Sequence, residues 1–162
     1  MARKVFYSFH YHDDVWRTSQ IRHIGIVEGD QKIIDHEWEK IKYKSDEAIY
    51  GWIDNQLRGR SCTIVLIGEK TAGRKFINYE IKQSWNAGKG VFGIYIHNLK
   101  DNSGNQASKG RNPFDTFTVS KQKLSSIIKT YDPPYLTSKN VYDYILNNIE
   151  AWVETAIKDR TS

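Results

Sequence analysis

Apolar and polar positions alternate along this chain in a way that predicts strands separated by helices. Continuous apolar runs at residues 5–9, 62–67 and 91–96 are typical of strands, and the last two suit strands covered on both faces. Weaker strand patterns lie at residues 24–27 and 124–131. The chain is therefore expected to form five strands, with the last one at an edge of the sheet.

Between these runs, apolar residues recur every three or four positions, which is the spacing of helices that bury one face. A cap at Ser45 and a stop at Gly59 bound the clearest of these helices. The others are marked by a start at Asp13 or Asp14 and a run towards Arg22, by Ile77, Ile81 and Trp85 before Gly88, and by an apolar stripe over residues 141–156.

Strands that alternate with helices predict an α/β fold with a mostly parallel sheet and helices on both faces. We expect a flavodoxin-like three-layer sandwich over residues 1–162, with five strands in the order 2-1-3-4-5. In that order ligands bind beyond the carboxyl ends of strands 1 and 3. The predicted topology therefore brings His10, Tyr11 and Glu80 to one crevice.

Composition narrows the class of ligand. Hydrophobic residues make up 39% of the chain, which is enough for a core, and the formal net charge of +5 favours anionic ligands such as nucleotides. No long basic run is present, so a nucleic-acid partner is not expected. The single cysteine, Cys62, lies in an apolar run and is expected in the core. Without a signal peptide or a membrane-spanning stretch, we expect a cytoplasmic protein that does not bind membranes.

Several common site motifs are missing. Neither a G-x-G-x-x-G sequence nor a Walker A sequence follows the first strand, which argues against a Rossmann dehydrogenase and a P-loop NTPase. His10, His12 and Asp13 could supply metal ligands, but in an extended chain His10 and His12 point to opposite sides. No metal site is therefore expected.

The chain resembles a known family at several segments. Residues 4–11, which read Lys-Val-Phe-Tyr-Ser-Phe-His-Tyr, look like the first strand of TIR domains. Residues 61–67 and 75–81 resemble the third strand of TIR domains and the helix that follows it. In that helix an aromatic residue, commonly Trp, lies four positions before a catalytic Glu, and here Phe76 and Glu80 hold those places.

A closer resemblance is to the TIR-like proteins of Thoeris anti-phage systems. It rests on the Ser-Phe-His-Tyr segment, on the helix that opens at Ser45-Asp46, and on the Gly- and Asn-containing loop over residues 100–115. The similarity covers residues 3–115. Two features depart from the family: Phe76 replaces the usual Trp, and the proline-containing loop after strand 2 has no clear counterpart. Self-assembly through that loop is therefore not supported by the sequence.

The resemblance implies an enzyme that cleaves the nicotinamide–ribose bond of NAD and releases nicotinamide together with an ADP-ribose signal, expected to be cyclic. NAD is then the substrate, and no cofactor or metal is needed. Self-association or a phage component is implied as the activator, and a separate effector protein as the reader of the product. Glu80 is the implied catalytic residue, and the implied substrate-binding residues are Ser8, Phe9, His10, Tyr11, Trp38 and Phe76.

Simpler interpretations remain for these residues. Glu80 is expected in the first turn or so of its helix, where the dipole favours any carboxylate, catalytic or not. Phe76 and Trp38 could equally close the core. For the whole chain, the alternatives are a TIR-like module that only binds proteins and a receiver domain. A receiver needs an acidic cluster at the end of strand 1, which the His-Tyr-His-Asp-Asp segment at residues 10–14 fits poorly.

Overall fold

The centre of the protein is a parallel sheet. The computed structural model describes residues 3–25, 27 and 43–161, and all statements about structure refer to these residues. The main sheet has the order β1-β2-β3-β6, and its strands are β1 (Val5–Ser8), β2 (Cys62–Ile67), β3 (Gly90–Tyr95) and β6 (Thr130–Tyr131). Every residue of β2 and β3 is buried, as their continuous apolar sequences predict.

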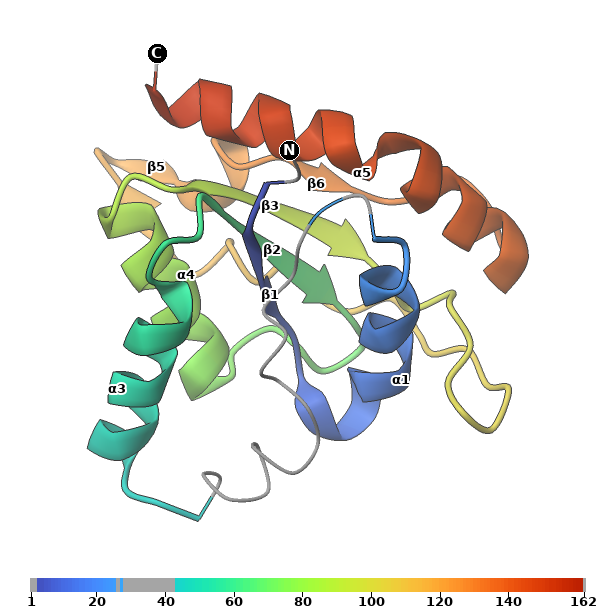
Figure 1. Cartoon of the computed structure of the whole chain (residues 1–162). Helices are drawn as coiled ribbons and strands as arrows, with labels where there is room; N and C mark the ends of the chain where they lie inside the picture. Colours follow the sequence, from blue (N-terminus) through green and yellow to red (C-terminus); the bar gives the residue numbers. More distant parts are fainter. Residues whose placement is uncertain (1–2, 26, 28–42, 162) are drawn as a thin grey trace.

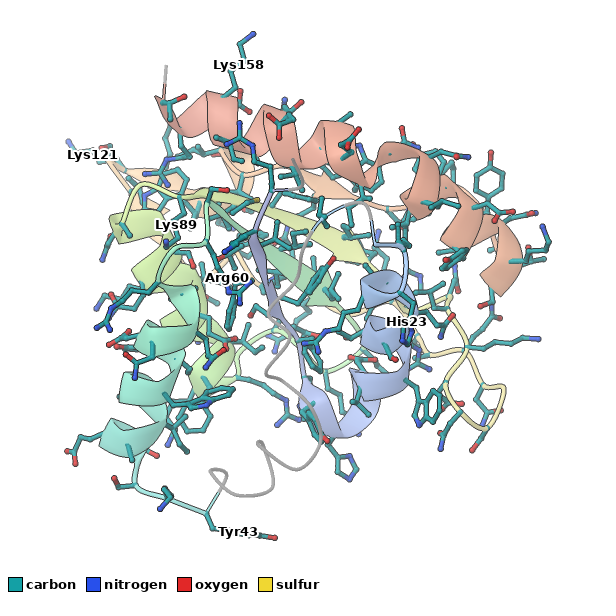
Figure 2. The ribbon with its side chains drawn as sticks, in the orientation of Figure 1. His23, Tyr43, Arg60, Lys89, Lys121 and Lys158 are labelled. Carbon is teal, nitrogen blue, oxygen red and sulfur yellow. The ribbon has the colours of Figure 1, made fainter. Side chains whose placement is uncertain are left out.

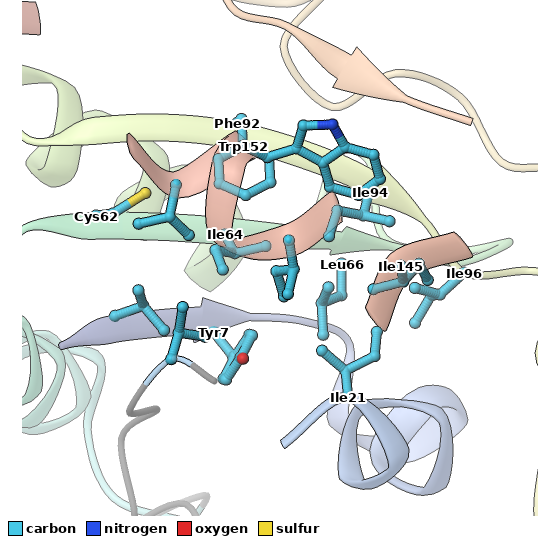
Figure 3. Packing of buried hydrophobic residues seen from close by; sticks show 14 of the residues in the cluster. Tyr7, Ile21, Cys62, Ile64, Leu66, Phe92, Ile94, Ile96, Ile145 and Trp152 are labelled. Atoms are coloured by element: carbon cyan, nitrogen blue, oxygen red, sulfur yellow. The ribbon is translucent and has the colours of Figure 1, made fainter. Parts of the chain in front are cut away.

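Helices cover both faces of the sheet, which gives three layers (Figure 1). On one face lie α1 (Tyr11–Arg22) and α5 (Ser138–Thr161), and on the other lie α3 (Asp46–Leu57) and α4 (Lys75–Asn86). Figure 3 shows the core under α5, where Trp152 and Ile145 pack above the strands and Ile21 of α1 joins them. The predicted flavodoxin-like sandwich is confirmed.

The alternation of side chains along β1 decides what faces the site. Val5 and Tyr7 belong to the core under α1 and α5, whereas Phe6 packs with Ile49 and Ile53 of α3. Because side chains in a strand alternate between faces, Ser8 shares the face of Phe6. The hydroxyl of Ser8 is therefore directed towards the layer formed by α3 and α4.

The helix boundaries follow local sequence signals with one exception. Ser45 caps α3 as predicted, because its hydroxyl accepts a hydrogen bond from the backbone N–H of Ala48 at 3.2 Å. The first helix, in contrast, begins at Tyr11 with His10 as the N-cap. The predicted start at Asp13 or Asp14 was therefore wrong, and both residues lie inside the first turn.

The predicted strand over residues 24–27 is absent from the part of the chain that the structure describes. The backbone N–H of Ile24 still donates to the carbonyl of Ile21, and Gly25 follows with φ of +75°. A left-handed residue directly after the last helical turn ends the helix and prevents an extended run at that point. The predicted strands 1, 3, 4 and 5 correspond to β1, β2, β3 and β6, in the predicted order.

The last predicted strand, over residues 124–131, is much shorter than expected. Residues Leu124–Ser126 form a 3₁₀ turn, and only Thr130 and Tyr131 pair with β3. Just before it, β4 (Thr118–Val119) and β5 (Gln122–Lys123) form an unpredicted hairpin. Its two-residue turn has φ of 50° at Ser120 and 69° at Lys121. Positive φ at both central residues usually selects Asn or Gly, so this turn carries no sequence signal.

None of the helices in the described ranges is both long and apolar enough to span a bilayer.

Candidate active site

A cavity of about 390 Å³ lies at the carboxyl end of β1, beside α3 and the start of α4. Its volume falls within the range of small-molecule sites. Aromatic and aliphatic side chains line the cavity together with two histidines, two basic residues and the Glu80 carboxylate. The lining residues are Tyr7, Phe9, His10, Tyr11, His12, Trp52, Ile53, Arg74, Lys75, Phe76, Ile77 and Glu80.

Among the described residues that line the cavity, Glu80 is the only carboxylate, and a neighbouring strand holds it in place. The hydroxyl of Ser8 donates a hydrogen bond to Oε1 of Glu80, with 2.6 Å between the oxygens. Ser8 is fully buried and Glu80 is 8% exposed. A short hydrogen bond to a charged acceptor is stronger than one between neutral groups. The carboxylate therefore has a defined orientation where it meets the cavity.

The helix dipole contributes less to this site than the sequence suggested. Helix α4 begins at Lys75, so Glu80 is its sixth residue and lies in the second turn. The dipole effect falls off within the first turn. The expected position in the first turn was thus slightly wrong. The Ser8 hydroxyl, at the end of β1, orients the carboxylate through its hydrogen bond.

Aromatic rings from several elements line the cavity. The rings of Phe9 and Tyr11 lie 6.2 Å apart between centroids, tilted by 32°. On the opposite wall, Phe76 makes an edge-on contact with Tyr50 at 5.8 Å, which holds its ring beside the cavity. Trp52 adds a third wall from α3. Rings in these positions can pack against a flat aromatic ligand.

Basic groups lie on the rim of the cavity. Lys75 forms an ion pair with Asp46 at 2.6 Å, so its charge is partly compensated. The Nε atom of Arg74 donates to the carbonyl of Lys70 at 2.9 Å. Burial, followed by the charge of Arg74, lowers the pKa of His10, so this imidazole is neutral at pH 7. The rim therefore carries positive charge on Arg74 and a neutral imidazole on His10.

A buried ion pair anchors the start of α1. Oδ1 of Asp14 accepts from Nη1 of Arg17 at 2.8 Å, and Arg17 also donates to the carbonyls of Leu99 and Asn105 at 2.7 and 2.9 Å. Burial raises the pKa of Asp14. The chain after β2 passes close by, because a Cβ on Gly68 would lie 2.0 Å from Oδ2 of Asp14. Only glycine fits here without moving the buried carboxylate.

The structure brings most of the predicted site residues together. Phe9, His10, Tyr11, Phe76 and Glu80 all line the cavity. Ser8 does not line it and instead lies behind Glu80 as its hydrogen-bond donor. Trp38 lies outside the described residues.

Other lining residues were missed by sequence reasoning. Trp52 follows the helical spacing of Ile49 and Ile53, which is typical of a core position, although it lines the cavity. Arg74 is the N-cap of α4 and Lys75 its first residue, and only this Arg-Lys pair at a helix start could have indicated an anion-binding rim.

The sequence argument against a metal site used a wrong geometry. Because α1 begins at Tyr11, the chain is not extended over residues 10–12. One ligand atom from each of His10, His12 and Asp13 lies within 4.8 Å of the other two.

The fold and the cavity together define a flavodoxin-like α/β protein with a cavity at the carboxyl end of its first strand, lined by the Glu80 carboxylate. The chain belongs to the family of the Thoeris protein ThsB, TIR-like domain, whose family model matches residues 6–101. This match confirms the resemblance found in the sequence, and it spans β1, Glu80 and the rest of the cavity lining.

The chain is also similar to a protein whose name states an activity. The chain is 40% identical over 120 residues to a protein of Bacillus cereus (strain MSX-D12) named "Putative cyclic ADP-D-ribose synthase ThsB1". The aligned part is 71% of this chain and 62% of the relative's length. The chain therefore matches less than two thirds of that protein.

Proposed function

We propose that this protein cleaves the nicotinamide–ribose bond of NAD and forms an ADP-ribose product, cyclic in the expected case, as part of anti-phage defence. The observation that carries the proposal is the Glu80 carboxylate, held by Ser8 at 2.6 Å on the wall of an aromatic cavity. Membership of the Thoeris TIR-like family and the name of the Bacillus cereus relative support the choice of NAD as substrate.

A single carboxylate is chemically sufficient for this reaction. When the bond between ribose C1′ and the pyridinium nitrogen breaks, its electron pair passes to the nitrogen and nicotinamide leaves as a neutral molecule. The leaving group therefore needs no general acid, unlike that of an ordinary glycoside. Positive charge develops on the ribose, and the Glu80 carboxylate would stabilise it electrostatically. An oxygen of water, or an atom of the ADP-ribose itself, then bonds to C1′ and loses its proton, which gives a linear or a cyclic product.

The other lining residues suit the remaining parts of NAD. Phe9, Tyr11 and Phe76 can pack against the nicotinamide ring near Glu80. The guanidinium of Arg74 on the rim can bind the diphosphate, because its planar donors match phosphate oxygens. His10, neutral at pH 7, can hydrogen-bond a ribose hydroxyl or a phosphate. Trp38 is a further proposed residue for stacking on the adenine or nicotinamide ring.

The cellular setting is proposed from the family. We infer that the protein acts in the cytoplasm and is activated by self-association or by a phage component. Its product is then read by a separate effector protein. No metal or cofactor takes part in this reaction as proposed, and no nucleic-acid or membrane partner is required.

The test is release of nicotinamide from NAD, followed by chromatography, with purified protein in the absence and presence of phage-infected lysate. Glu80→Gln keeps the size and hydrogen-bonding capacity of the side chain but removes its charge. We expect it to lower the rate by about 100-fold or more, in line with the loss of one electrostatic stabiliser. Glu47→Gln, an exposed carboxylate in the first turn of α3, is the matched control and should cleave at the wild-type rate.

Equal release by wild type and Glu80→Gln would overturn the role of Glu80. Absence of release from the wild type, even with infected lysate, would overturn the activity and favour the TIR-like interaction module instead. Arg74→Gln should raise the KM for NAD more than it lowers kcat, since the side chain is assigned to binding of the diphosphate.

A further inference from the structure

Three potential metal ligands meet where β1 passes into α1. His10 is the N-cap of α1, and His12 and Asp13 lie in its first turn. The turn of the helix folds these residues towards one another, so that one donor atom of each lies within 4.8 Å of the other two. The proposed NAD chemistry uses neither His12 nor Asp13, so this cluster needs a separate explanation.

The distances are close to those of a metal site. Nε2 of His10 lies 3.7 Å from Oδ2 of Asp13, and Nδ1 of His12 lies 2.9 Å from Oδ1 of the same carboxylate. In a tetrahedral zinc site, metal–ligand distances of 2.0–2.2 Å place neighbouring ligand atoms about 3.3 Å apart. The two distances to the Asp13 carboxylate bracket that value, and the donor atoms of the two imidazoles lie within 4.8 Å of each other.

Two of the three donor side chains are accessible from solvent. The side chain of His12 is 89% exposed and that of Asp13 is 28% exposed, so an ion can enter from solvent. Lys70 and Arg74 lie close enough to His10 to oppose a cation. Affinity must therefore come from direct bonds to the three donors rather than from the surrounding charge.

We propose that His10, His12 and Asp13 bind a divalent transition-metal ion of the zinc class. Two imidazoles and one carboxylate select such ions over Mg²⁺ and Ca²⁺, which prefer oxygen ligands. His10 and His12 both line the cavity that contains Glu80, so the ion lies at the mouth of that cavity with a fourth position open to solvent. The site is defined by these donors alone and does not depend on cleavage of NAD.

The experiment is direct metal binding to the full chain without an affinity tag. Zn²⁺ binding is measured by calorimetry, and Co²⁺ binding by the visible absorption that identifies four-coordinate cobalt. His12→Ala removes an exposed ligand. His23→Ala is the matched control, because His23 is an exposed histidine at the other end of the same helix (Figure 2). Asp13→Asn is a second variant that keeps the shape of the carboxylate.

We expect one ion per chain for wild type and His23→Ala, with the cobalt absorption of a four-coordinate site. His12→Ala and Asp13→Asn should each weaken binding by about 10- to 100-fold or more, since even loss of a group that only orients a ligand has that effect. The proposal is overturned if the wild type binds neither metal at millimolar concentration. It is equally overturned if all four proteins bind with the same affinity, because the ion would then lie elsewhere.

Discussion

Removal of the Ser8 hydroxyl should reduce catalysis as well as stability. The bond from Ser8 to Glu80 is 2.6 Å long and lies in the buried layer between β1 and α4. A hydrogen bond to a charged group contributes about 1.5–3 kcal/mol. If that energy holds the carboxylate in its reactive orientation, Ser8→Ala should lower kcat for NAD cleavage by about 10- to 150-fold, with little change in KM.

A matched control separates this effect from general destabilisation. Ser84, on the same helix as Glu80, shares a buried hydrogen bond of 2.7 Å with Thr63. Ser84→Ala therefore also removes a buried hydroxyl, at a cost of about 1 kcal/mol, but leaves the cavity intact. Thermal unfolding should show a loss of stability in both variants, of about 1 kcal/mol for Ser84→Ala and about 1.5–3 kcal/mol for Ser8→Ala. If Ser8→Ala retains as much activity as Ser84→Ala, the positioning role of Ser8 is wrong.

Other predictions concern stability. Gly68→Ala should destabilise the protein by about 3 kcal/mol or more, because its Cβ would meet the buried carboxylate of Asp14 at 2.0 Å. Gly51→Ala, inside α3 with no atom within 4 Å of the new Cβ, should instead stabilise the protein by about 1 kcal/mol. Denaturant titration measures the free energy of unfolding of both variants, and equal changes in the two would contradict the packing argument. Burial lowers the pKa of His97 below its ordinary value, so the unfolded chain binds more protons than the folded protein at mildly acidic pH. The melting temperature should therefore fall as the pH drops from about 7.5 to about 5.5, and it should fall less in His97→Gln. The same dependence of melting temperature on pH in both proteins would show that His97 is not the cause.

Much of the site could be predicted because it lies at element boundaries that local sequence defines. The run that forms β1 and the helix that carries Phe76 and Glu80 are both visible in the sequence, and the rule for parallel sheets then brings their ends together. The catalytic assignment of Glu80 needed the family resemblance. Helix position alone would describe it as an ordinary carboxylate near a helix start.

What the sequence could not supply was the identity of the contacts. The hydrogen bond from Ser8 to Glu80 joins residues 72 positions apart, and it depends on which face of β1 meets α4. Trp52 follows core spacing, yet the shape of the layer directs it into the cavity. His10 and His12 come together only because the helix starts two or three residues earlier than its capping signals suggested.

In the described part of the chain, the sequence by itself determined the first three strands of the main sheet, three of the four helices to within a few residues at each end, and the order in which the four observed strands pair. These features follow from hydrophobic periodicity and turn residues, which act over neighbouring positions. The tertiary structure alone decided the Ser8–Glu80 bond, the aromatic and basic walls of the cavity, and the cluster of His10, His12 and Asp13. Those contacts depend on register, helix start and packing distance, which a linear pattern of residues does not specify.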